Sequence, residues 1–317
     1  MTIVPAFVSA AATTSSTATS KSVEALPFTL KQVGPGVYAA IDGPEGKSGS
    51  NAGFVIGDNG VLVVDAFFHP EATRSLIAQI HKITDKPIRY LVNTHYHIDH
   101  TGGDQVLRDA GAIIIAHHNE RAWVRTENLH LLGSHLTPLY KAQIAKLDLP
   151  DETTRHRMTI WLGHRKVVIE PALGHTGGDL MVSVPDAKLL FCGDIFWNHV
   201  SPNMIDGNVA QWIDTTNRLV NTPGAAQRTF VPGHGDVGRV ADVAALEGYF
   251  KALRTLVQKE RAAGLPGDAL VKAALPEFKH EFGSWAAIDY FAPLQLKYMD
   301  QELSGTKRVP TPVPDNE

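Results

Sequence analysis

The sequence predicts an α/β protein with mixed β-sheets. Two groups of short apolar runs, within residues 28–116 and 166–231, are bounded by Gly, Pro, Asn and Asp and are typical of strands. Stretches with the helical spacing of apolar residues follow the strands of both groups. With 317 residues, of which 44% are apolar, the chain can bury a sizeable core in one large domain or two small ones.

The first strand-rich half begins with two predicted hairpins. One, Phe28–Ala40, turns at Gly34-Pro35-Gly36, and the other, Gly53–Asp65, turns at Asp58-Asn59-Gly60. A helix is predicted next at Pro70–Ile83, because proline stands in its first turn and leucine and isoleucine follow at helical spacing. The half ends with a predicted strand at Ile88–Asn93, a helix at Asp104–Ala110 and a buried strand at Ala112–Ala116.

Residues 125–155, between the two halves, lack clear periodicity apart from a possible helix at Leu139–Ile144. Long segments of this kind often act as lids or substrate-binding loops. Five of its side chains either line an apolar wall or pack onto the body of the protein: Leu129, Leu131, Leu132, Leu136 and Tyr140.

The second half repeats the order of strand, loop and helix. Its predicted strands are Lys166–Glu170, the hairpin Leu180–Val184 with Lys188–Cys192, and Thr229–Val231. Its predicted helices are Val209–Leu219, Val240–Ala263 and a stretch around Trp285–Leu303. We interpret residues 240–317 as outer helices of the same domain, with a small helical cap as the alternative.

One stretch concentrates metal-binding side chains directly after a predicted strand. His95, His97, Asp99 and His100 fall within six positions, and Gly102-Gly103 follows. In an extended segment His95 and His97 point the same way, because strand side chains repeat every two residues. Imidazole and carboxylate ligands suit zinc and its first-row neighbours. The sequence therefore predicts a transition-metal site at the carboxyl end of a strand, where open α/β sheets usually place their chemistry.

This stretch and three later motifs resemble the metallo-β-lactamase superfamily. His-x-His-x-Asp-His followed by Gly-Gly is the signature of that superfamily, and three segments continue the pattern in order: Gly174-His175-Thr176-Gly177-Gly178, Phe191-Cys192-Gly193-Asp194 and Pro232-Gly233-His234-Gly235. The resemblance implies a four-layer αββα sandwich of two mixed β-sheets with outer helices, which we place at residues 23–305. The motifs are specific for fold and metal site but weak for substrate, because this fold hosts many hydrolases.

The resemblance further implies a metal-dependent hydrolase with two zinc ions per chain. One ion would be held by His95, His97 and His175. The other would be held by Asp99, His100 and His234, and Asp194 would bridge the two. Ions roughly 3.5–4 Å apart can share a water and lower its pKa toward about 7, which gives a hydroxide nucleophile. Asp99 would orient this nucleophile, and Asp65 would support the metal loop from behind. The remaining histidines, among them His117 and His118, are expected at the surface or behind the ligands.

The surroundings of Asp194 bear on the substrate. Several β-lactamase branches have a cysteine ligand at this place, and some have a substrate-binding lysine where this chain has Trp197. Lactonase-like and glyoxalase II-like branches have the bridging aspartate. The stretch Val231–Gly238 nevertheless looks more like the β-lactamase end. We therefore predict β-lactam ring opening, with lactone or thioester hydrolysis as one alternative and a non-catalytic metal-binding module as another. Candidate substrate contacts, with ordinary loop packing as their alternative, are Phe67, Phe68, Trp197, Asn198 and Asn203.

Composition and charge narrow the classes of binding partner that we expect for this chain. The formal net charge of −4 and the lack of a basic stripe argue against a nucleic-acid surface. No apolar run approaches the roughly 20 residues of a membrane span. We expect a small-molecule substrate and no nucleic-acid, membrane or protein partner. Cys192, the single cysteine, permits no intrachain disulfide and is expected to be buried and structural.

The ends of the chain differ in composition from the rest. Residues 1–22 are interpreted as the remnant of a secretory signal or as a disordered tail. A signal would predict a periplasmic or secreted protein, with a cytoplasmic one as the alternative. Residues 306–317, rich in proline, are interpreted as an extended or disordered tail.

Overall fold

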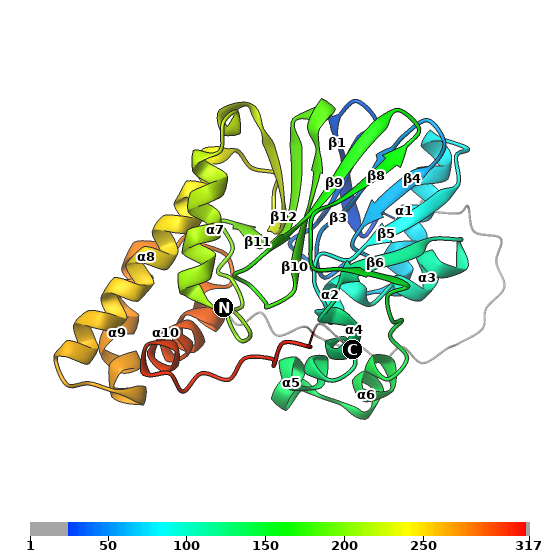
Figure 1. Cartoon of the computed structure of the whole chain (residues 1–317). Coiled ribbons are helices and arrows are strands. Elements are labelled where there is room, and N and C mark those ends of the chain that lie inside the picture. The colour runs from blue at the N-terminus through cyan, green and yellow to red at the C-terminus, as the bar shows by residue number, and fades with distance from the viewer. Residues whose placement is uncertain (1–24, 315–317) are drawn as a thin grey trace, which may run out of the picture.

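A computed structural model of the chain describes residues 25–314. The interpretation of residues 1–22 therefore lies outside the described residues. Two β-sheets lie face to face, and helices lie on their outer sides (Figure 1). The predicted α/β class and the four-layer αββα arrangement are confirmed.

The first sheet has the strand order β1-β2-β3-β4-β5-β6-β7. Its strands are β1 (Phe28–Gly34), β2 (Val37–Asp42), β3 (Ala52–Ile56), β4 (Val61–Val64), β5 (Ile88–Val92), β6 (Ile113–His117) and β7 (Glu152–Thr154). Neighbours from β1 to β4 pair antiparallel, and those from β4 to β7 pair parallel. Helices α1 (Pro70–Ile83) and α3 (Asp104–Asp109) cover the outer face, where Leu76 and Leu107 share a buried cluster with Phe54 and Leu91.

The second sheet has the order β12-β11-β10-β9-β8, in which only β11 and β12 pair parallel. Its strands are β8 (Met158–Leu162), β9 (Arg165–Ala172), β10 (Asp179–Val184), β11 (Leu189–Asn198) and β12 (Thr229–Gly235), with short 3₁₀ turns η2 (Pro185–Ala187) and η3 (Ala225–Gln227). The helices that follow are α7 (Val209–Asn221), α8 (Val240–Ala262), α9 (Gly267–Phe282) and α10 (Ile288–Ser304). A single buried cluster joins Leu190 and Phe230 of the sheet to Phe250, Phe278 and Leu296 of the helices. The helices after residue 240 therefore share the core of the second sheet.

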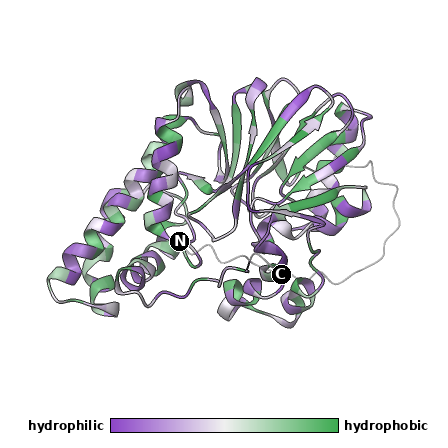
Figure 2. Ribbon diagram, in the orientation of Figure 1, coloured by the Kyte–Doolittle hydropathy of each residue, from purple (hydrophilic) through white to green (hydrophobic). Residues whose placement is uncertain are grey.

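Apolar side chains from both sheets meet in the middle layer. Val55 and Leu62 of the first sheet pack in one cluster with Ile169, Val182 and Phe191 of the second. Figure 2 shows the strands as mostly hydrophobic, whereas the outer helices alternate between hydrophobic and hydrophilic residues. Burial of these faces drives the two sheets together and fixes which loops meet at the edge of the sandwich.

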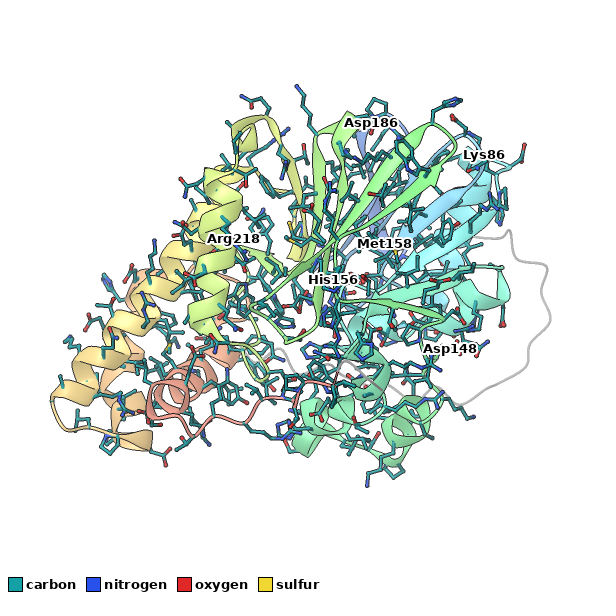
Figure 3. All side chains as sticks on the ribbon, viewed as in Figure 1. Lys86, Asp148, His156, Met158, Asp186 and Arg218 are labelled. Carbon is teal, nitrogen blue, oxygen red and sulfur yellow. The ribbon has the colours of Figure 1, made fainter. Side chains whose placement is uncertain are left out.

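A group of short helices lies at one end of the strands. It comprises α4 (Glu120–Trp123), α5 (Glu127–Leu132), η1 (Gly133–His135) and α6 (Pro138–Ile144), and the last of these is the helix predicted at Leu139–Ile144. In Figure 3, Asp148 lies near this end, and Lys86 and Asp186 lie at the opposite end of the strands. We call α4 to α6 the lid.

The chain leaves α10 and crosses to the lid in an extended conformation, shown in red in Figure 1. We call residues 306–314 the strap. The indole Nε1 of Trp123 donates to the carbonyl of Thr311 (3.0 Å), and the backbone N–H of Val313 donates to Asn119 Oδ1 (3.1 Å). The described part of the tail is therefore extended, as one of the two sequence interpretations has it, and is held against the lid.

The structure departs from the predicted elements in several places. Strands β7 and β8 and helices α4, α5 and α9 were not predicted, and of these α5 and β7 lie within residues 125–155, where no periodicity was recognised. Strand β11 continues past Asp194 to Asn198, whereas the sequence suggested an end at Asp194. None of the helices in the described range, residues 25–314, is long and apolar enough to cross a membrane.

Candidate metal centre

The metal loop begins where β5 ends and is held from behind by Asp65. Its carboxylate accepts the backbone N–H of Thr94 at Oδ1 (2.7 Å), and its Oδ2 lies 2.9 Å from His100 Nδ1. Asp65 has a φ of +60°, in the left-handed region that non-glycine residues seldom adopt. Such a strained backbone persists where its surroundings fix it and is common at functional sites. The support expected from Asp65 is present in the structure.

Two groups of metal-binding side chains meet at this edge of the sandwich. Within each group the ligand atoms lie within 4.8 Å of one another. The first group is His95, His97, His175 and Asp194, and the second is Asp99, His100 and His234. They come from the loop after β5, the short helix α2 (Ile98–Thr101), the β9–β10 loop, β11 and β12. All seven ligands expected from the sequence are thus brought together.

Asp194 lies between the two groups. Its Oδ2 is 3.2 Å from His175 Nε2, and its Oδ1 is 3.1 Å from His100 Nε2. Two glycines let the backbone approach this carboxylate. A Cβ on Gly233 would lie 1.8 Å from Asp194 Oδ1, and Gly193, at φ +51°, would place a Cβ 2.4 Å from Thr94 Oγ1. No other residue type fits either position without displacing the site.

Buried atoms without partners indicate that cations belong here. His95 Nε2, His100 Nε2, His234 Nε2 and Asp194 Oδ1 are buried, and none makes a hydrogen bond of acceptable geometry, although His100 Nε2 and Asp194 Oδ1 lie 3.1 Å apart. A buried polar atom left unsatisfied costs about 1–3 kcal/mol, so a convergence of four in one place requires compensation. Imidazole nitrogens and carboxylate oxygens with this spacing fit zinc or a similar first-row ion. The residues present therefore fit the metal that the resemblance implies.

The protonation of the ligands follows from their burial and charge. Burial lowers the pKa of His175 to about 3, and burial together with the charge of His100 holds the pKa of His95 well below its usual range. Both rings are therefore neutral at pH 7, as metal ligands must be. Burial would raise the pKa of Asp99, but the neighbouring His100 and His234 outweigh it and lower that pKa to about 2.

Asp206, which was not singled out from the sequence, holds His97 in place. Its Oδ2 lies 3.2 Å from His97 Nε2 and accepts the phenol of Tyr96 (2.5 Å). His97 Nδ1 faces the first group and lies 2.9 Å from His175 Nε2. A carboxylate on the far nitrogen fixes the tautomer and orientation of a ligand imidazole. Asp206 lies 109 positions from His97, so no local pattern in the sequence marks it.

Two further side chains fix the loops that carry ligands. Asp179 accepts the backbone N–H groups of His175 (3.0 Å) and Thr176 (2.9 Å), although burial raises its pKa to about 8. Asn128 of the lid accepts the N–H of Ile98 (2.8 Å) and donates to the carbonyl of Tyr96 (2.7 Å). The lid is thereby joined to the metal loop.

A cavity of about 400 Å³ opens over the ligands Asp99, Asp194, His97 and His234. Its apolar walls are Phe68, Ile98, Leu131, Leu132, Trp197, Val200, Ala287 and Phe291. Its polar walls besides the ligands are His135, Asn203 and Tyr290. The Trp197 ring stacks on His234, with centroids 4.0 Å apart, so the apolar wall begins at a metal ligand.

The five candidate substrate contacts separate into two sets. Phe68, Trp197 and Asn203 line the cavity. Phe67 and Asn198 do not: Phe67 is fully buried and stacks on Phe28, and Asn198 donates to the carbonyl of Asp236 (2.8 Å). Phe67 has a φ of +62°, in the left-handed region that non-glycine residues seldom adopt.

The remaining candidates occupy structural positions. Cys192 is buried in the core beneath α7 and α8, and burial raises the pKa of its thiol. Within residues 25–314, neither His117 nor His118 belongs to a metal-binding group. In the lid, Leu131 and Leu132 line the cavity, and Leu136 packs in the cluster beneath the lid, so both alternatives for this segment hold in part.

Comparison with known proteins agrees with this fold and site. The family model of the metallo-beta-lactamase superfamily matches residues 46–262, and the chain belongs to that superfamily. A solved metallo-beta-lactamase from Pontibacter korlensis matches the structure with a TM-score of 0.56 at 19% identity, covering 71% of this chain and 99% of the other. At this identity the likeness supports the fold alone.

Curated relatives carry two different names. The chain is 25% identical over 186 residues to a metallo-beta-lactamase type 2 from Bacillus cereus, covering 56% of this chain and 64% of that protein. It is 26% identical over 228 residues to a hydroxyacylglutathione hydrolase from Rhodospirillum rubrum, covering 66% and 79%. The match thus spans less than two thirds of the Bacillus protein. Membership of the superfamily indicates a metal-dependent hydrolase, and the two names leave its substrate open.

Proposed function

We propose that this chain is a dinuclear zinc hydrolase that opens cyclic amides or esters of small molecules. The observation that carries the proposal is the position of seven ligand side chains beneath one apolar cavity. Bound zinc would supply a water of lowered pKa and polarise the substrate carbonyl. In the overall reaction the water oxygen bonds to the carbonyl carbon, the ring C–N or C–O bond breaks, and the freed nitrogen or oxygen takes up a proton.

Asp99 is the ligand that we assign to proton transfer. Its side chain is 26% exposed, whereas that of Asp194 is 2% exposed, and both line the cavity. The low pKa of Asp99, about 2, keeps its carboxylate ready to accept a hydrogen bond from the attacking water. From the same position it can pass a proton to the leaving atom, the role of a general acid and base.

Two finer assignments compete. β-Lactam ring opening is supported by the similarity to proteins named metallo-beta-lactamase type 2. Lactone or thioester hydrolysis is supported by Asp194 between the two ligand groups and by the similarity to hydroxyacylglutathione hydrolases. A non-catalytic metal-binding module is the remaining alternative, and the open, ligand-lined cavity argues against it.

The deciding experiment is hydrolysis by zinc-loaded protein with and without a chelator. A chromogenic cephalosporin and an acyl-homoserine lactone are assayed side by side, and zinc content is measured in the same samples. Chelator-sensitive turnover of either substrate supports the proposal and selects the ring type. Protein that holds zinc but hydrolyses neither of them, nor any thioester of a broad panel, would be a non-catalytic module.

Export is part of the proposal for the full chain. The small and apolar residues near the N-terminus suggest a periplasmic or secreted enzyme, with the cytoplasm as the alternative. Fractionation of cells that produce the protein from its native gene, followed by mass measurement of the mature N-terminus, distinguishes the two. A cleaved, periplasmic form supports export, and an intact form confined to the cytoplasm contradicts it.

A further inference from the structure

The cavity over the metal centre has a distinctive charge composition. Among the described residues that line it there is no lysine or arginine. Its polar groups other than the metal ligands are an imidazole, a carboxamide and a phenol, from His135, Asn203 and Tyr290. A substrate that enters therefore meets aromatic and aliphatic surface and the hydrogen-bonding groups of these three side chains.

Basic side chains near the cavity are committed to other partners. Lys307 Nζ donates to the carbonyls of Met204 (2.7 Å) and Gly207, in the loop that carries Asn203. Arg308 forms an ion pair with Glu127 of the lid (2.6 Å). Neither side chain lines the cavity, and moving either one into it would break these contacts.

The apolar surface begins directly beside the reaction centre. Trp197 stacks on His234, and its ring centroid lies 6.3 Å from that of Phe291 at 79°. On the far side, the Tyr290 hydroxyl lies 3.3 Å from His135 Nε2 and joins α10 to the lid across the opening. A carbonyl placed at the metals would thus direct its substituents against aromatic rings.

We propose that this site selects uncharged substrates with an apolar acyl or alkyl group and discriminates against those with a carboxylate remote from the scissile carbonyl. The inference rests on the proposed hydrolase function and deepens it. A carboxylate held away from the metals in this cavity loses hydration and meets no lysine or arginine among the described lining residues, whereas a methyl group at the same position gains apolar contact. Among cyclic substrates this favours neutral lactones over β-lactams, whose ring systems carry an acidic group.

A matched pair of esters tests the selection directly. 4-Nitrophenyl hexanoate and mono-4-nitrophenyl adipate have the same chain length and leaving group, and differ in a terminal methyl against a terminal carboxylate. We expect kcat/KM of the zinc-loaded enzyme to be at least about tenfold higher for the hexanoate, after correction for spontaneous hydrolysis. Equal values, or a preference for the adipate, would overturn the proposal.

A substitution that supplies the missing charge sharpens the test. Asn203 is half-buried in the cavity wall, so Asn203→Lys introduces a cation there, and Asn203→Gln is its neutral control. We expect the ratio of kcat/KM for the adipate to kcat/KM for the hexanoate to be at least about fivefold higher in Asn203→Lys than in Asn203→Gln. A folded, zinc-loaded Asn203→Lys protein with no rise in this ratio would contradict the proposal.

A binding measurement separates this inference from the proposed function. If neither ester is hydrolysed, hydrolase function fails on these substrates, and the cavity can still be tested with hexanamide and adipic acid monoamide. Binding of each to zinc-loaded protein is followed by tryptophan fluorescence, because Trp197 lies in the wall. Tighter binding of hexanamide supports the selection of uncharged ligands, and equal or weaker binding refutes it.

Discussion

The two sides of the cavity are built in different ways. On the metal side, buried ligands come from a few loops at the ends of strands, and buried carboxylates such as Asp65 and Asp206 hold them. On the opposite side, the wall combines the lid with α10, and an exposed pair, Tyr290 and His135, joins the two. The contrast indicates that buried carboxylates of the core fix the two groups of metal-binding side chains, whereas the opposite wall of the cavity is set by contacts between the lid and α10.

The largest effect is expected on the metal side. His95→Ala removes a buried ligand from the first group, and its neighbours cannot replace it. We expect zinc content to fall by about one ion per chain and hydrolysis to drop to background. Zinc analysis and kcat/KM of the purified variant measure this. His164→Ala, which changes an exposed histidine away from the site, is the control, and similar losses in both variants would contradict the assignment.

A substitution of Asp99 should lower the rate of hydrolysis much more than it lowers the zinc content. Asp99→Asn keeps an oxygen ligand but removes the carboxylate that we assign to proton transfer. We expect kcat to fall at least about 100-fold, within the range for loss of a general acid or base, while most of the zinc remains. Asp214→Asn, the same change at an exposed position of α7, is the matched control. A kcat near that of the unmodified protein would show that Asp99 has no such role.

A substitution of Asp206 tests how strongly a residue that contacts a ligand, but is not itself a ligand, affects zinc affinity. Asp206→Asn weakens the contact with His97 Nε2 and removes the charge that Tyr96 also contacts. We expect zinc affinity to fall about 10- to 100-fold, with kcat of the fully loaded enzyme changed much less. Competition with a chromophoric chelator measures the affinity. Unchanged affinity would confine the role of Asp206 to packing.

The sequence predicts the metal side better than the wall, because its signals are local. His95 and His97 belong to one short motif, and the motifs around His175, Asp194 and His234 follow in order along the chain. Asp206 was missed because its relation to His97 exists only after folding brings residues 109 positions apart into contact. The metal ligands can thus be predicted from short sequence motifs, whereas the residue that supports His97 can be found only in the folded structure.

The wall was predicted only in part, for the same physical reason. Of two adjacent phenylalanines, Phe67 is buried against Phe28 in the core and Phe68 lines the cavity. The sequence pattern cannot choose between two neighbouring phenylalanines. The approach of Tyr290 to His135, 155 positions away, follows from the packing of α10 and the lid. Strand β8 escaped prediction because its outward side chains, such as exposed Trp161, obscure the alternation.

The strap offers the smallest expected change, because it contacts the lid and none of the seven ligand side chains. Arg308 pairs with Glu127, Thr311 accepts from Trp123, and Val313 donates to Asn119, so three contacts hold the lid beside α10. Each is worth about 0.5–1.5 kcal/mol at most, and the exposed ion pair less. A chain that ends at Thr306 loses all three, together with the bonds of Lys307 to Met204 and Gly207 and of Arg155 to Val313. A chain that ends at Pro314 keeps them and serves as the control.

We expect the chain ending at Thr306 to retain its zinc and its kcat within about twofold, and to show KM raised about three- to tenfold for an apolar substrate. The reason is that a looser lid lets Leu131 and Leu132 move away from the cavity, which lowers binding in the ground and transition states alike. Steady-state kinetics and zinc analysis of both truncated chains measure this. A fall in zinc content would show that the strap also supports the metal ligands. An unchanged KM would show that the lid keeps its position without the strap.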